Sequence, residues 1–115
     1  MSDHPASKTK VYIKTDSWLA FLAARKLRAG AVAIVFGNTI HLYKTRPGDF
    51  LANRSWVLHE LKHVEQYQRY GLLKFLYHYL RESFNKGYFN NALEIEARNA
   101  ENDGSLLDKF EIMQP

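Results

Sequence analysis

The stretch His59-Glu60-Leu61-Lys62-His63 decides the fold, because it places two histidines four positions apart in a helical segment. Four residues of α-helix rise about 6 Å and turn through about 400°, so both imidazoles lie on one face and can bind one cation. Glu60 lies one position further round the helix, close to the cation without being forced to bind it. The stretch therefore predicts a zinc site with His59 and His63 as ligands and Glu60 as the catalytic base.

The composition narrows the class of protein and the choice of ligands. A chain of 115 residues that is 46% hydrophobic and 14% aromatic fits one domain with a single core. Cysteine is absent, so disulfides and thiolate metal sites are unavailable, and any metal must be bound by His, Asp, Glu and water. The net charge of +4 is spread along the chain without a basic run. We interpret this charge as surface solvation and expect no nucleic-acid partner.

The N-terminal residues 1–10 are polar and show no periodicity. We expect them to form a flexible arm, which leaves residues 11–115 as the single domain. They lack the apolar segment of a signal peptide, and no run approaches the roughly 18 apolar residues needed to cross a bilayer. These features predict a cytoplasmic protein that does not contact a membrane, and no pattern indicates an oligomeric state.

A β-hairpin is predicted between the N-terminus and the histidines. Residues 31–36 are apolar and β-branched, residues 37–39 are Gly-Asn-Thr, and residues 40–43 alternate between apolar and polar. A two-stranded hairpin is marginal alone and must pack on helices. Its edge could bind an extended peptide by backbone hydrogen bonds, or it could be covered by residues 11–14. Both alternatives remain open on the sequence.

Helical periodicity covers most of the remaining chain. The predicted helices run from Asp16 or Ser17 to Gly30, from Asn53 or Ser55 to Tyr70, over about 73–84, over about 92–101, and as a short last helix within 105–113. The predicted fold class is α+β, with an N-terminal helix, a hairpin or small antiparallel sheet, the histidine-bearing helix and a helical C-terminal half.

Two histidines leave a catalytic zinc site incomplete, because such sites usually have three protein ligands and an open position for water. Glu94 and Glu96 are the downstream candidates for the third ligand. They lie two positions apart in a predicted helix, so they point about 200° away from each other and only one can face the metal. Glu94 could instead cap its own helix, because Asn91 precedes it at the spacing of a capping box.

The pattern His59-Glu60-x-x-His63 followed by Glu94-x-x-Ala97 resembles that of the gluzincins, in which a glutamate on a later helix is the third zinc ligand. Residues 36–40 and 58–66 extend the likeness to the small bacterial minimal gluzincins, over roughly residues 31–101. The resemblance implies a zinc metallopeptidase. One Zn²⁺ would be bound by His59, His63 and Glu94, and a peptide or protein substrate would be hydrolysed with Glu60 as general base.

One departure from the gluzincin pattern bears on function. Many gluzincins carry an aspartate four residues after the third ligand, where it holds a zinc-bound histidine, and this chain has Arg98 there. Asn91, Asn99 or a backbone carbonyl could orient the histidine instead. The departure keeps open an alternative function, a non-catalytic zinc-binding module that acts in protein interaction.

Further candidates lie outside the zinc ligands. His78 could stabilise the transition state, although a histidine in such an aromatic-rich helix is more often a packing residue. Tyr67 and Tyr70 share the predicted metal face and are weaker candidates for the same role. Residues 106–115 could cover the site, with Asp108 or Glu111 near the metal, or they could simply pack against the domain.

Overall fold

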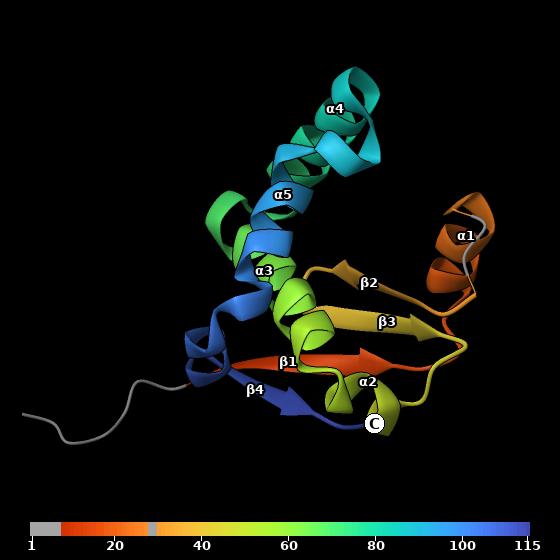
Figure 1. Ribbon diagram of the computed structural model, residues 1–115, viewed down its shortest axis with the longest axis vertical. Coiled ribbons are helices and arrows are strands. Elements are labelled where there is room, and N and C mark those ends of the chain that lie inside the picture. Colours follow the sequence, from red (N-terminus) through yellow and green to blue (C-terminus); the bar gives the residue numbers. More distant parts are fainter. Residues whose placement is uncertain (1–7, 28–29) are drawn as a thin grey trace, which may run out of the picture.

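The computed structural model describes residues 8–27 and 30–115, which form an α+β domain (Figure 1). Residues 1–7 of the predicted arm and positions 28–29 of the predicted first helix lie outside the described residues. In chain order the elements are β1 (Thr9–Lys14), α1 (Trp18–Leu27), β2 (Val32–Phe36), β3 (Thr39–Tyr43), α2 (Pro47–Ala52), α3 (Arg54–Tyr70), α4 (Leu72–Asn90), α5 (Ala92–Asn99), the 3₁₀ helices η1 (Ala100–Asn102) and η2 (Gly104–Asp108), and β4 (Phe110–Met113).

The strands form one four-stranded sheet in the order β2-β3-β1-β4. The predicted hairpin is confirmed, because β2 and β3 pair antiparallel around the turn at Gly37 and Asn38. The complete sheet is mixed and larger than the predicted antiparallel one, since β1 pairs parallel with both β3 and β4. Thr9 and Lys10, assigned to the flexible arm, are instead part of β1. Because β1 covers the β3 edge of the hairpin, β2 is left as an edge strand of the sheet.

Helices pack on both faces of the sheet because strand residues alternate between the faces. On one face Val32 of β2 packs with Ala20 and Ala24 of α1. The opposite face packs on α3 and includes Val11, Ile13, Val35, Ile40 and Leu42. Figure 1 shows α1 and α4 both beyond the β2 edge of the sheet, whereas the C-terminus lies near β4 at the other edge.

The histidine-bearing helix α3 begins and ends where the sequence predicts. The Asn53 side chain accepts a hydrogen bond from the Trp56 N–H at 3.3 Å and caps the first turn. Gly71 ends the helix with φ of 79°, a left-handed conformation that favours glycine. Val57, Leu61 and Val64 are at most 3% exposed and anchor one face of α3 in the core. This packing fixes the direction of the opposite face, which carries the histidines.

The C-terminal segment differs from its prediction. The predicted last helix is wrong, because residues 104–108 form the 3₁₀ helix η2 and Phe110–Met113 form β4. Strand β4 pairs with β1 at the sheet edge opposite β2. No residue of 106–115 lines the hollows beside the histidines, and Leu106 and Phe110 are buried in the core. Of the two alternatives for this segment, packing against the domain is therefore the one the structure shows, and Asp108 and Glu111 do not cover the site. Within the described residues, no helix is long and apolar enough to cross a membrane.

Candidate metal centre

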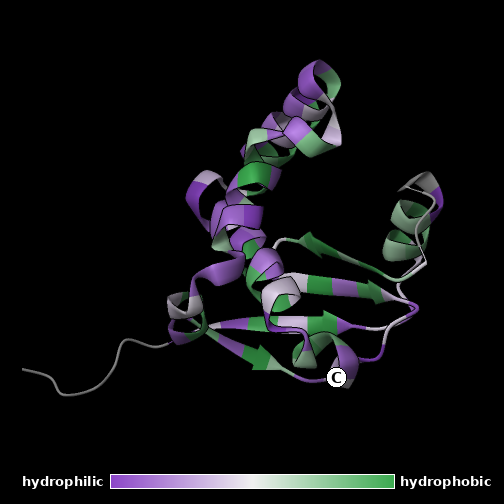
Figure 2. Cartoon of the chain, in the orientation of Figure 1, coloured by the Kyte–Doolittle hydropathy of each residue, from purple (hydrophilic) through white to green (hydrophobic). Residues whose placement is uncertain are grey.

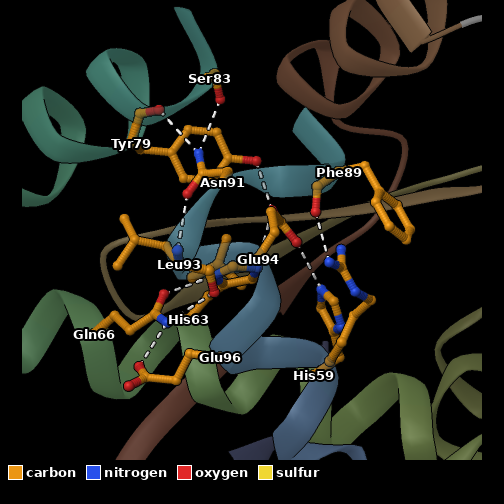
Figure 3. A network of polar contacts seen from close by, with 12 residues as sticks. His59, His63, Gln66, Tyr79, Ser83, Phe89, Asn91, Leu93, Glu94 and Glu96 are labelled. Atoms are coloured by element: carbon orange, nitrogen blue, oxygen red, sulfur yellow. Dashed lines mark hydrogen bonds and ion pairs between the residues drawn. The ribbon is translucent and has the colours of Figure 1, made fainter. Parts of the chain in front are cut away.

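His59 and His63 of α3 converge with Glu94 of α5 on one point (Figure 3). The Nε2 atom of His59 lies 3.0 Å from Oε1 of Glu94, and Nε2 of His63 lies 3.2 Å from Oε2 of the same carboxylate. One ligand atom from each of the three residues lies within 4.8 Å of the other two. Two imidazole nitrogens and one carboxylate oxygen form a donor set that fits a metal ion and leaves a further position open. The three side chains are therefore a group that could hold a metal.

Glu94, and not Glu96, faces the histidines. Glu96 points to the other side of α5, where its Oε1 accepts hydrogen bonds from Gln66 at 2.8 Å and from Arg69 at 3.2 Å. The capping alternative for Glu94 is not realised either. The side chain of Asn91 caps α5 by accepting from the Leu93 N–H at 2.8 Å, while both oxygens of Glu94 face the histidines.

Each histidine is held by a hydrogen bond at its second ring nitrogen. Nδ1 of His59 lies 2.8 Å from Oε2 of Glu101, and Nδ1 of His63 donates to Oε1 of Gln66 at 2.9 Å. The amide nitrogen of Gln66 is itself fixed by the Leu93 carbonyl at 3.0 Å. These contacts direct both Nε2 atoms at Glu94, which is how side chains around a metal commonly orient its histidine ligands.

Arg98 takes no part in orienting the histidines. It donates to the Phe89 carbonyl at 2.6 Å, and its guanidinium lies 4.0 Å from the centre of the Phe89 ring. Glu101 supplies the carboxylate that the gluzincin pattern would place at Arg98. Neither Asn91 nor Asn99 contacts a histidine among the hydrogen bonds of the described residues.

The sequence patterns did not identify three residues that contact the metal-binding group: Glu101, Gln66 and Tyr79. The Tyr79 hydroxyl donates to Oε2 of Glu94 at 2.5 Å. Glu101 had a usable signal, since it follows Glu94 by seven positions, which is two helical turns on the same face. Tyr79 had none, because its position depends on how α4 folds back over α5.

The carboxylates of Glu60 and Glu94 and the imidazoles of His59 and His63 shift one another's pKa values. Burial raises the pKa of Glu60 to about 7, although the charges of His63 and His59 oppose the rise. Burial lowers the pKa of His59, but the hydrogen bond to Glu94 and the charge of Glu60 outweigh it and raise that pKa to about 9. Burial would raise the pKa of Glu94, yet its hydrogen bonds to His59 and His63 leave it well below the usual range. The directions of these shifts favour positively charged histidines paired with an ionised Glu94.

Two hollows meet at the centre. An apolar cleft of about 330 Å³ is lined by the whole of β2, by α1 and α4, and by His59, Glu60 and His63. A more polar hollow of about 460 Å³ continues past His59 toward Ser55 and Glu101. Ala33 and Tyr88 line both. The edge strand β2 and the metal-binding group therefore line the same cleft.

The predicted transition-state stabilisers are not gathered at the centre. His78 packs between Tyr70 and Tyr77, with ring centroids 5.2 and 5.8 Å away, and neither His78 nor Tyr70 lines a cleft. Tyr67 lines the apolar cleft, but its hydroxyl donates to the Val35 carbonyl at 3.2 Å. Tyr88, which the sequence patterns did not single out as a stabiliser, lines both hollows.

A comparison with family models places the chain in a family. The model described as the eCIS core domain matches residues 6–71, which extends from before β1 to Gly71 at the end of α3. The matched range contains His59, Glu60 and His63 and ends before Glu94. None of the comparisons identifies a gluzincin, and neither a curated protein nor a solved structure matches the chain significantly. Because the matched range covers more than half of the 115 residues, the chain belongs to the eCIS core domain family.

Proposed function

We propose that the protein is a zinc-dependent metallopeptidase. The observation that carries this proposal is the convergence of His59, His63 and Glu94 beside a buried Glu60 and an edge strand. Zn²⁺ bound by these residues would acidify a water molecule and polarise a substrate carbonyl. The chain's own contribution is to fix the donor atoms, to supply a base and to align the substrate.

Glu60 is the proposed general base and acid. Its side chain is only 5% exposed and lines both hollows, so it can reach a water molecule and a peptide bond. Burial raises the pKa of this carboxyl group above its usual range, which supports a role in both accepting and returning a proton. In the proposed reaction Glu60 accepts a proton from the attacking water and delivers it to the nitrogen of the leaving amine.

Strand β2 is the proposed substrate-aligning element. In the hairpin, Phe36 pairs with Thr39 next to the turn, so Ala33 and Val35 direct their backbone groups to the outer edge. Tyr67 already binds the Val35 carbonyl, in agreement with this direction. Ala33 is then the residue whose N–H and C=O can pair with an extended substrate.

The test combines metal analysis with the Glu60→Gln variant. We expect the variant to keep one zinc per chain and to lose about 10²- to 10⁴-fold in the rate of peptide cleavage, because only the proton-accepting group is removed. Glu111→Gln, at an exposed position of β4, is the matched control and should cleave as the wild type does. Cleavage by Glu60→Gln at the wild-type rate would refute the mechanism.

The second candidate function is a non-catalytic zinc-binding module for protein interaction. The metal group joins α3 to α5, so a bound ion would fasten the C-terminal half to the rest of the domain. Membership in the eCIS core domain family, whose name refers to extracellular contractile injection systems, supports contacts with other proteins. This function predicts that chelation lowers the melting temperature while the metal-loaded wild type leaves every peptide of a mixture intact.

A further inference from the structure

The apolar cleft beside the metal centre carries charge only at the centre itself. Its charged side chains are the three metal-binding residues and Glu60, and the rest of its lining within the described residues is aliphatic or aromatic. The hydroxyls of Tyr67 and Tyr79 already donate to the Val35 carbonyl and to Glu94. A charged side chain that entered the cleft away from the centre would lose its water without gaining a partner, which is unfavourable. The cleft therefore favours apolar groups.

The cleft is large enough for more than one side chain. A cavity of about 150 Å³ lined by Leu, Ile and Phe holds a benzene molecule, whereas the volume here is about 330 Å³. Part of the lining is a stack of aromatic rings. The ring centroids of Tyr67 and Phe75 lie 3.8 Å apart, and those of Phe75 and Tyr79 lie 5.7 Å apart. Because these rings hold one another in place, a ligand meets an apolar surface that is already formed.

The lining of the cleft comes from both sides of the edge strand β2. Every residue of β2 lines it, and Figure 2 shows this strand coloured as hydrophobic. On the face of the sheet that packs on α1, the cleft has an α1 subsite formed by Leu19, Ala23 and Ile34. On the side of α3 and α4, it has an α4 subsite formed by Phe75, Leu76 and Leu80. The strand edge and the metal-binding group are common to both subsites.

We propose that the cleft recognises an extended segment of polypeptide with apolar side chains at consecutive positions, an inference that rests on the proposed peptidase function. Side chains of an extended chain alternate between the two faces of a sheet. A segment that pairs with the outward N–H and C=O of Ala33 therefore directs one side chain to the α1 subsite and the next to the α4 subsite. Because folded proteins bury such segments, the substrates are unfolded or locally opened chains.

The first test maps the cleavage of a mixed peptide library by the zinc-loaded full chain, with mass spectrometry of the products. We expect apolar residues at two consecutive positions next to the cleaved bond, with charged residues there at least about 10-fold rarer than in the library. Leu19→Glu and Leu80→Glu each place a carboxylate in one subsite. Each variant should admit Lys or Arg at one of the two positions, and the two variants should act on different positions.

Matched controls come from the same two helices. Leu22 of α1 and Leu73 of α4 are 50 and 79% exposed and line neither hollow, so Leu22→Glu and Leu73→Glu should keep the wild-type cleavage profile. Circular dichroism checks the fold of each variant. Leu80 is 67% exposed, so Leu80→Glu tests the α4 subsite independently of any effect that Leu19→Glu has on the folding of α1.

A binding assay separates recognition from hydrolysis. With the Glu60→Gln variant, fluorescence anisotropy compares a labelled peptide that has about six central apolar residues with one in which every second of these is lysine. The lysines of an extended peptide all point to one face, so they enter one of the two subsites in either register. We expect this peptide to bind at least about 10-fold more weakly.

The two assays distinguish the failure of this proposal from the failure of the proposed function. Selective binding of the apolar peptide, without cleavage of any peptide by the wild type, would refute the peptidase and support the recognition. Absent or equal binding of the two peptides would overturn the recognition. Cleavage next to charged residues as often as next to apolar ones would overturn it as well, while supporting the peptidase.

Discussion

Removing the Glu101 carboxylate tests whether this residue orients His59 for the metal. In the wild type, Nδ1 of His59 lies 2.8 Å from the Glu101 carboxylate. The Glu101→Gln variant keeps a side-chain oxygen that can accept this hydrogen bond and loses only the negative charge. In Glu101→Ala the acceptor is lost as well. Loss of such an orienting partner costs about 10- to 100-fold in metal affinity. The side chain of Glu101 is 36% exposed, so solvent screens its charge. We therefore expect the loss of metal affinity in Glu101→Gln to lie at the lower end of this range.

The expected values are therefore about a 10-fold loss of zinc affinity for Glu101→Gln and up to about 100-fold for Glu101→Ala, or roughly 1.4 and 2.7 kcal/mol. Competition of each variant with a chromophoric zinc chelator at pH 7 measures these losses without relying on catalysis. Asp108→Asn, an acidic position on η2 that lines neither hollow, is the control. Equal zinc affinities for the wild type, Glu101→Ala and the control would refute the orienting role of Glu101.

Three further predictions concern the edge strand, Arg98 and a histidine remote from the metal. Ala33→Pro removes a backbone N–H that points away from the sheet on an edge strand, a position where proline is tolerated. Zinc should stay bound, while kcat/KM for peptide cleavage should fall at least about 10-fold because one hydrogen bond to the substrate backbone is lost. Cleavage at the wild-type rate would exclude substrate pairing at Ala33. Arg98→Ala loses the contacts to Phe89 and should lower the free energy of unfolding by about 1 kcal/mol in denaturant titrations, with zinc affinity unchanged. Burial and the charge of Lys14 lower the pKa of His41, whose Nδ1 lies 2.8 Å from the Ser17 hydroxyl. Folding therefore favours the neutral form of His41. As the pH falls below about 6.5, His41 of the unfolded chain binds a proton more readily than His41 of the folded chain, so the free energy of unfolding should decrease. The melting temperatures of wild type and His41→Asn should diverge below this pH, and melting temperatures that change in parallel would contradict the assignment.

The sequence determined the parts of the protein that depend on local geometry. The spacing of His59 and His63 in a helix places both imidazoles on one face whatever the rest of the chain does. Asn53 and Gly71 mark the ends of that helix through their own backbone and capping preferences. The Gly-Asn turn fixes the antiparallel pairing of β2 with β3 in the same way. The α+β class follows from these local patterns.

Only the tertiary structure decided which residues complete the centre. Helical periodicity shows that Glu94 and Glu96 point in different directions, but the rotation of α5 against α3 selects Glu94. The same rotation brings Glu101 to His59 and leaves Arg98 at Phe89. Strand β4 forms because it pairs with the free edge of β1, which lies about 100 positions earlier in the chain. The four residues of β4 by themselves contain too little local pattern to distinguish a strand from a short helix. Contacts between distant segments depend on how whole elements pack, and no pattern within one element contains that information.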